Sequence, residues 1–190
     1  DLFEIREERV HPQKDDKILT DWNGLMISAL AKSAMVFDND EYKVAAIKAT
    51  DFILDNLRNN DGGLIKHYRN GRSIQNGLIE DYSFFIWGLI EMYQLTFNPY
   101  YLKNAIELSN YQIENFWDND DGGFYFTPKN GEELIVRTKE SYDGAIPSGN
   151  SVAAYNFIRL GRILSKPDYE NISYEIVDSF SSNLNKYGSG

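Results

Sequence analysis

The 190-residue sequence contains no cysteine and only two histidines, His11 and His67. The absence of cysteine excludes disulfide bonds, thiolate metal ligands and thiol redox chemistry in this chain, and it fits a reducing compartment. Because the two histidines fall in different predicted elements, they supply no histidine-rich metal site. We therefore expect neither a metal ion nor any other cofactor.

Long apolar runs and an excess of basic residues are missing as well. No segment approaches the roughly 18 consecutive apolar residues of a membrane span, and the first residues lack the apolar core of a signal peptide. Nineteen basic against 29 acidic residues give a net charge of −10, which argues against nucleic acid as a partner. Phosphate-binding glycine loops and nucleophile-elbow motifs are absent too. We expect a cytoplasmic protein without membrane or nucleic-acid partners.

Helical periodicity dominates what is present. A single folded domain over 1–190 with the mass of 21.9 kDa should expose about 9,300 Å². Six segments repeat apolar residues at helical spacing; they are 21–37, 40–58, 79–96, 99–117, 148–164 and 168–185. The first, third and fifth are apolar on nearly every side and must be surrounded by protein, whereas the others keep a charged or amide-rich face. This alternation predicts three antiparallel pairs of an inner and an outer helix, about 21–58, 79–117 and 148–185, after an N-terminal extension at 1–20.

A sixty-residue repeat links the first two pairs. The glycine-containing runs 60–63 and 120–123 are sixty residues apart, and so are Asp21 and Asp81 at the starts of two inner helices. Each glycine run leads into a strand-like segment followed by Asn-Gly, which is a strong hairpin signal. We expect small β-hairpins in at least two of the long loops, at 64–73 and after 124.

Polar and aromatic residues gather at the start of every inner helix. In a ring of helix pairs these starts converge on one opening, which makes them the candidate site. The candidates are Asp21, Trp22, Asn23, Glu80, Asp81, Tyr82, Asp143, Ser148 and Asn150. Carboxylates and amides bind hydroxyl groups, and an aromatic ring covers the apolar face of a sugar, so this set suits a neutral saccharide. Asp21, Asp81 and Glu80 are the candidates for acid, base or nucleophile at a glycosidic bond.

A structural interpretation of the same residues stays open. Asp, Ser and Asn at helix starts are what capping alone selects, and Asp21 in particular looks like an N-cap. Trp22 and Tyr82 are also suitable core residues, and we expect Trp87, in the middle of a helix, in the core. The second function is therefore a noncatalytic interaction scaffold.

Four strings in the sequence carry a resemblance to a known family. They are LTDWNGL at 19–25, GLIEDYSFFIWGL at 77–89, WDNDDGGFYF at 117–126 and DGAIPSGNSVA at 143–153. Together they resemble the spermatogenesis-associated protein 20 family, whose members join a thioredoxin-like domain to a helical toroid of the six-hairpin glycosidase type. Over about residues 1–165, this resemblance implies an all-α fold, an (α/α) toroid whose inner-helix starts line a cavity.

The resemblance also implies that the toroid is partial. Three helix pairs make half a toroid, and uncovered apolar helices at both ends predict self-association or packing against the missing half. Sugar epimerases of this fold use histidine proton shuttles, and neither histidine lies on a predicted inner helix. A carboxylate-based, glycoside hydrolase-like reaction is therefore favoured over epimerisation, with a scaffold serving a thioredoxin-fused protein as the alternative.

Overall fold

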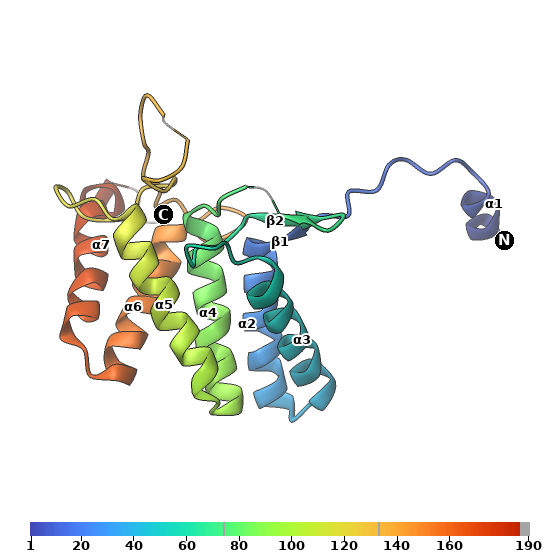
Figure 1. Cartoon of the computed structure of the whole chain (residues 1–190), viewed down its shortest axis with the longest axis horizontal. Helices are drawn as coiled ribbons and strands as arrows, with labels where there is room; N and C mark the ends of the chain where they lie inside the picture. The colour runs from blue at the N-terminus through green and yellow to red at the C-terminus, as the bar shows by residue number, and fades with distance from the viewer. Residues whose placement is uncertain (74, 133, 187–190) are drawn as a thin grey trace.

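Six long helices stand side by side in a row, and the long connections between pairs gather at one end of it (Figure 1). This computed structural model describes residues 1–73, 75–132 and 134–186. The long helices are α2 (Thr20–Phe37), α3 (Asp40–Asn56), α4 (Ile79–Thr96), α5 (Pro99–Phe116), α6 (Gly149–Leu164) and α7 (Pro167–Lys186). Their bounds follow the predicted segments to within two residues. The all-α architecture of three helix pairs is confirmed.

The helices form two layers, as the alternation of apolar and amphipathic segments predicts. The central helix α4 packs against α2, α6 and α5, while α3 covers α2 and α7 covers α6. Twelve of the 18 residues of α4 are buried, because neighbours surround this helix on three sides. Helices α2, α4 and α6 are therefore the inner layer, and α3, α5 and α7 the outer layer.

Two glycines allow α2 and α4 to approach closely. A Cβ added at Gly24 would lie 2.6 Å from the backbone carbon of Phe84 and from the backbone nitrogen of Phe85. On the facing helix, a Cβ at Gly88 would lie 3.1 Å from the carbonyl oxygen of Gly24. Neither distance leaves room for an ordinary side chain, so the contact between these two helices depends on glycine.

One of the two predicted hairpins is present. Strands β1 (Ile18–Leu19), β2 (His67–Arg69) and β3 (Arg72–Ser73) form an antiparallel sheet in that order. Asn70 and Gly71 connect β2 to β3 with φ values of 52° and 72°, as a tight Asn-Gly turn requires.

The second hairpin prediction is wrong. Residues 124–127 make one isolated bridge, between Phe124 and Trp117, and no strand. The backbone N–H and carbonyl of Phe124 are instead paired with the side chain of Asn150. Gly131 turns back with its amide bonded to the carbonyl of Pro128. A side chain from α6 thus takes the hydrogen bonds that a partner strand would have made.

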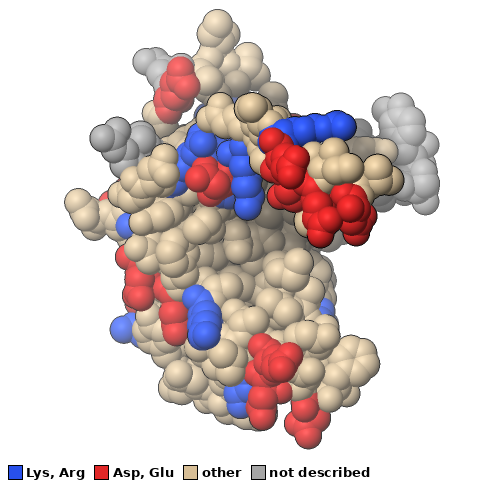
Figure 2. All heavy atoms as spheres, turned by 90° about the vertical axis from the view of Figure 1, so that its right-hand side faces the viewer, with Lys and Arg blue, Asp and Glu red and all other residues tan. Residues whose placement is uncertain are grey.

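The row is open at both ends. The exposed surface of 11,451 Å² exceeds the roughly 9,300 Å² of a compact protein of this mass. Part of the excess belongs to the N-terminal arm, where the short helix α1 (Leu2–Glu7), which the sequence did not predict, lies away from the row (Figure 1). Another part belongs to the end formed by α2 and α3, where Figure 2 shows an uncharged band between charged regions above and below. Among the described residues, no helix has the length and hydropathy needed to cross a bilayer.

Candidate functional site

The amino ends of the three inner helices lie at the same end of the row, beneath the long loops (Figure 1). Asp21 stands in the first turn of α2, Glu80 and Asp81 in the first turn of α4, and Ser148 is the N-cap of α6. Each backbone amide in these first turns lacks a partner within its own helix. The acidic side chains are therefore favourably placed with respect to the helix dipoles.

Asp81 joins the starts of two inner helices. Its side chain is fully buried. One oxygen, Oδ1, accepts a hydrogen bond from the backbone amide of Asp21 at 3.0 Å, and Oδ2 accepts one from the amide of Leu78 at 2.8 Å. The same carboxylate therefore caps α4 and holds the beginning of α2.

The prediction that Asp21 is the N-cap of α2 is wrong. The helix begins at Thr20, and Leu19 occupies the cap position without a side-chain hydrogen bond. Asp21 lies one residue inside the helix, where its Oδ1 accepts a bond from the amide of Trp22 at 2.7 Å. The capping carboxylate comes from Asp81 of the neighbouring helix, which no local pattern in the sequence reveals.

A lysine that the sequence analysis missed lies between the two aspartates. The Nζ atom of Lys66 is 3.8 Å from Oδ2 of Asp21 and 3.8 Å from Oδ2 of Asp81. Lys66 precedes β2, and its carbonyl accepts a hydrogen bond from the amide of Thr20 at 3.0 Å. The only signal in the sequence was a lone cation in the strand-like run after the first glycine turn.

Burial perturbs the titration of two carboxyl groups in this cluster. Desolvation raises the pKa of Asp81 to about 7, although the Lys66 ammonium and two backbone amides act in the opposite direction. Desolvation also raises the pKa of Glu80, against the effect of Lys66 and together with the charges of Asp21 and Glu140. Glu80 is only half-buried, so it is the carboxyl group of this pair that a ligand can reach.

Of the two candidate aromatic platforms, only Trp22 has an accessible ring. Its side chain is 56% exposed, and Met26, one turn later, is 58% exposed. Tyr82 is buried; its hydroxyl accepts a bond from the amide of Leu64 at 2.7 Å, and its ring stacks on Tyr111 with centroids 5.3 Å apart. Burial raises the pKa of Tyr82 far above the normal range of a phenol. Tyr82 thus fastens the first glycine turn to the core.

Asn23 also bonds locally, since its Nδ2 donates to the carbonyl of Leu19 at 2.7 Å. On the side of α6, Asp143 Oδ1 accepts a bond from the amide of Ser148 at 2.7 Å. The hydroxyl of Ser148 in turn accepts one from the amide of Ser151 at 3.1 Å. Asp143 and Ser148 therefore fix the first turn of α6 and the loop that leads into it.

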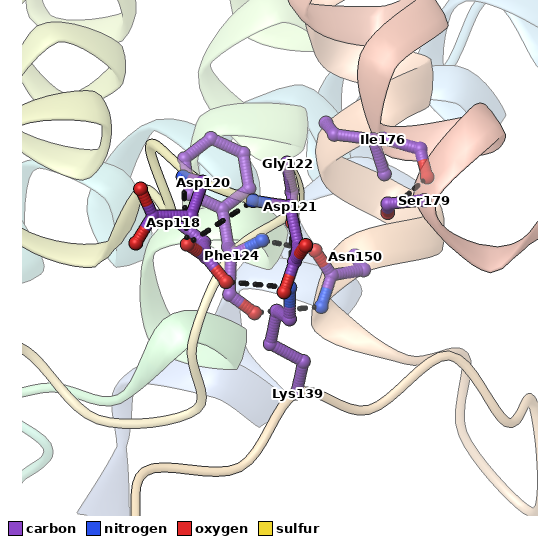
Figure 3. A network of polar contacts seen from close by, with 9 residues as sticks. All are labelled: Asp118, Asp120, Asp121, Gly122, Phe124, Lys139, Asn150, Ile176 and Ser179. Atoms are coloured by element: carbon purple, nitrogen blue, oxygen red, sulfur yellow. Dashed lines mark hydrogen bonds and ion pairs between the residues drawn. The ribbon is translucent and has the colours of Figure 1, made fainter.

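Asn150 holds two loops at once. Its Oδ1 accepts a bond from the amide of Phe124 at 2.8 Å, and its Nδ2 donates to the carbonyls of Phe124 at 3.0 Å and of Glu140 at 2.8 Å. Figure 3 shows the amide of Asn150 facing Phe124 beside the second glycine turn. This buried side chain anchors to α6 both the turn and the segment that carries Glu140.

A second buried ion pair secures the same turn (Figure 3). Asp118 accepts bonds from the amides of Asp120 and Asp121, and its Oδ2 lies 2.7 Å from Nζ of Lys139. Burial acts to raise the pKa of Asp118, but Lys139 and the backbone amides outweigh it and lower the pKa to about 2. Lys139 also donates to the carbonyl of Gly122 at 2.8 Å. The turn beside the opening is therefore rigidly held.

Six of the nine predicted site residues thus form two clusters. Asp21 and Asp81 flank Lys66, which also acts to lower the pKa of the neighbouring Glu80, and the α6 cluster of Asp143, Ser148 and Asn150 orders the adjoining loops. Across residues 1–73, 75–132 and 134–186, no group of three or more acidic or histidine side chains is arranged to hold a metal ion. A half-buried carboxyl with a raised pKa, next to a second carboxylate and an ammonium, is suited to proton transfer.

Curated relatives match nearly the whole chain. Spermatogenesis-associated protein 20 of Rattus norvegicus is 29% identical over 195 residues, which cover 97% of this chain and 25% of the relative. The human protein of the same name gives the same identity and coverage. The chain therefore spans about a quarter of the length of these relatives. No family model matches it.

Several solved structures with the same fold are carbohydrate enzymes. A family 76 α-mannanase from Bacteroides thetaiotaomicron superposes with a TM-score of 0.74 at 17% identity, over 92% of this chain and 47% of the mannanase. Cellobiose 2-epimerase from Bacillus thermoamylovorans gives 0.73 at 17% identity, over 90% and 46%. The resemblance of this chain to the spermatogenesis-associated protein 20 family is confirmed, and its fold is a partial (α/α) toroid of the six-hairpin glycosidase type.

Proposed function

We propose that this chain is the saccharide-binding part of a carbohydrate-processing toroid. The support is twofold. The fold is shared with glycoside hydrolases and with a carbohydrate epimerase, and the starts of the inner helices bring Asp21, Glu80 and Lys66 together at one end. Hydroxyl-rich ligands suit such a surface, because carboxylates accept and ammonium groups donate hydrogen bonds to hydroxyls.

In this proposal Glu80 is the proton donor or acceptor at a glycosidic bond. The half-buried position of Glu80 beside Asp21 and Lys66 is the observation that carries the assignment, because desolvation there raises the pKa of Glu80 and perturbed carboxyl groups of this kind are suited to proton transfer. Asp21 is the second carboxylate, Lys66 and Asp81 position both helix starts, and the exposed ring of Trp22 covers the apolar face of a sugar.

A thermal-shift screen against neutral mono- and disaccharides tests this proposal. We expect at least one saccharide to raise the midpoint of unfolding of the native sequence, and Glu80→Gln to abolish hydrolysis of the corresponding aryl glycoside. Glu107→Gln is the matched control, since Glu107 lies half-exposed on the outer helix α5. Equal hydrolysis by Glu80→Gln and the native sequence would refute the assignment.

The alternative is a noncatalytic scaffold. It is favoured by the hydrogen bonds of Asp81 and Asn150, whose side chains are occupied by backbone groups. For a scaffold we expect no saccharide to shift the unfolding midpoint, while Asp81→Ala and Asn150→Ala lower it.

We also propose that the open ends of the row pack against further helix pairs. The superposition includes 92% of this chain but only 47% of the mannanase. This chain therefore supplies about half of a ring. Exposed apolar side chains mark one end with Met26 and the other with Tyr174 and Val177.

Sedimentation velocity distinguishes the two possible occupants of these ends. Concentration-dependent dimerisation that Met26→Glu and Val177→Glu each weaken would identify a second copy. A monomer at all concentrations would favour other segments of a longer protein. Val10→Glu is the control, because Val10 is fully exposed on the N-terminal arm.

A further inference from the structure

A strip of α4 remains open although the helix is largely buried. Glu80, Trp87 and Gln94 retain exposed surface and recur every seven residues, which is about two helical turns, so they share one face. The prediction that Trp87 belongs to the core is therefore wrong. Its indole is partly buried and lies on the same strip as Glu80, further from the opening.

Below the opening, this strip carries a charged cluster built from all three inner helices. The buried carboxylate of Glu91 accepts a hydrogen bond at Oε1 from Nε1 of Trp87 at 2.9 Å and another from Arg159 of α6 at 2.7 Å. Lys32 of α2 approaches the same oxygen at 3.4 Å. One carboxylate oxygen thus connects α2, α4 and α6.

Two cations share this single carboxylate, which leaves a surplus of positive charge. Arg159 is held firmly, because its second nitrogen donates to Oε1 of the neutral Gln94 at 3.0 Å. Lys32 is held loosely, since its side chain is 44% exposed and its contact with Glu91 is long. An ammonium has three donors, so Lys32 can bind an additional anionic group.

Aromatic rings stand beside both cations. Nζ of Lys32 lies 4.9 Å from the ring centroid of Trp87, and the guanidinium of Arg159 lies 4.9 Å from that of Tyr155. The two rings meet edge to face with centroids 5.7 Å apart. Tyr155 is 44% exposed, so a sugar ring has an apolar surface to lie on next to the cations.

The two ends of the strip differ in charge. At the opening, Asp21 and Asp81 flank Lys66, and Glu80 is a third carboxyl group near enough for Lys66 to affect its pKa. Glu91 lies eleven residues after Glu80 in α4. At the helical rise of 1.5 Å per residue, the two positions are about 16 Å apart along the helix axis. The two clusters are therefore separate, and an acidic ligand group is repelled by the first and attracted by the second.

We propose that Lys32, Arg159 and Tyr155 form a subsite for the carboxylate of a uronic acid, so that an acidic saccharide lies along the inner helices with its charged sugar away from the opening. This rests on the proposed saccharide function and specifies the class of saccharide. The ammonium of Lys32 pairs with the carboxylate, while Tyr155 covers the sugar ring.

Calorimetric titration of the 190-residue chain with two matched disaccharides tests the subsite. One carries a glucuronate unit and the other a glucose unit at the same position. We expect the acidic disaccharide to bind about fivefold more tightly at low salt, as one partly exposed ion pair provides, and the preference to shrink as salt is added. Lys32→Gln should remove the preference.

The control is Lys103→Gln, on the exposed side of α5, which should keep the preference. Equal affinity of the native sequence for both disaccharides, or an undiminished preference in Lys32→Gln, would overturn the subsite and leave the proposed function standing. Binding of neither disaccharide would overturn both.

Discussion

The carboxylate of Asp81 accepts a hydrogen bond from the backbone amide of Asp21, 60 residues earlier in the chain, at 3.0 Å. These residues hold equivalent places in the sequence repeat, at the starts of two inner helices. Because Asp81 also accepts the amide of Leu78, it fixes α4 and α2 relative to each other at the opening. The acidic cluster is therefore part of the framework as well as the candidate site.

Replacing Lys66 with methionine should raise the pKa of both Asp81 and Glu80. In each case Lys66 is the main group that opposes the effect of burial, so its removal leaves desolvation less compensated. Carboxyl-carbon NMR titrations of the native sequence and of Lys66→Met measure the change directly.

Lys103→Met is the matched control for this titration. Lys103 pairs with Glu107 on the exposed side of α5, and its loss should move neither midpoint. Unchanged titration of Asp81 in Lys66→Met would contradict the ion-pair geometry at the opening.

The stability of the fold should decrease as the pH rises toward neutrality. Burial raises the pKa of Asp81 from 3.8 to about 7, so the folded protein binds this proton more tightly than the unfolded chain. The stabilisation from this group is fully present below about pH 4 and is lost as the pH rises through about 7, with a slope of up to about 1.4 kcal/mol per pH unit.

Urea unfolding at pH 5, 6, 7 and 8 measures this dependence. Asp81→Asn should flatten the slope, because the asparagine amide does not titrate. A free energy of unfolding that rises from pH 5 to pH 8 would show that the buried carboxyl is ionised throughout.

The helices follow from the sequence because the information that sets them is local. The apolar spacing that defines each helix lies within the helix itself. The caps are equally local, since Asn98 precedes Pro99 at the start of α5 and Ser148 directly precedes α6. The cap of α2 failed as a prediction because Asp81 supplies it from another helix.

Other features of the site could not be predicted from the sequence, because they also depend on contacts between segments that are distant in the chain. The predicted hairpin after 124 is replaced by side-chain hydrogen bonds from Asn150. Trp87 has the surroundings of a core residue in sequence, yet it lies on the strip of α4 that neighbouring helices leave partly open. Lys66 gained its role only when the first long loop returned to the start of α2.

Substituting alanine for Gly24 should strongly destabilise the fold. The added Cβ would lie 2.6 Å from two backbone atoms of the facing helix, at Phe84 and Phe85, and backbone cannot move aside as a side chain does. We expect a loss of about 3 kcal/mol in the free energy of unfolding. Gly144→Ala, whose Cβ would meet only the ring of Tyr142 at 3.4 Å, should change it by less than about 0.5 kcal/mol. Similar unfolding curves for the two variants would argue against the close approach of α2 and α4.

Asn150→Ala should release the second glycine turn while leaving the helices folded. The substitution removes three hydrogen bonds. It leaves the buried backbone N–H and carbonyl of Phe124 without their bonds to Asn150. At about 1 kcal/mol for each bond, the free energy of unfolding should fall by about 3 kcal/mol.

Hydrogen exchange at the Phe124 amide should accelerate more than exchange in α4, since local opening becomes easier than global unfolding. Asn130→Ala, which removes one exposed bond to Tyr111, should leave that amide protected. Retained protection of Phe124 in Asn150→Ala would mean that Lys139 and Asp118 hold the turn without help from α6.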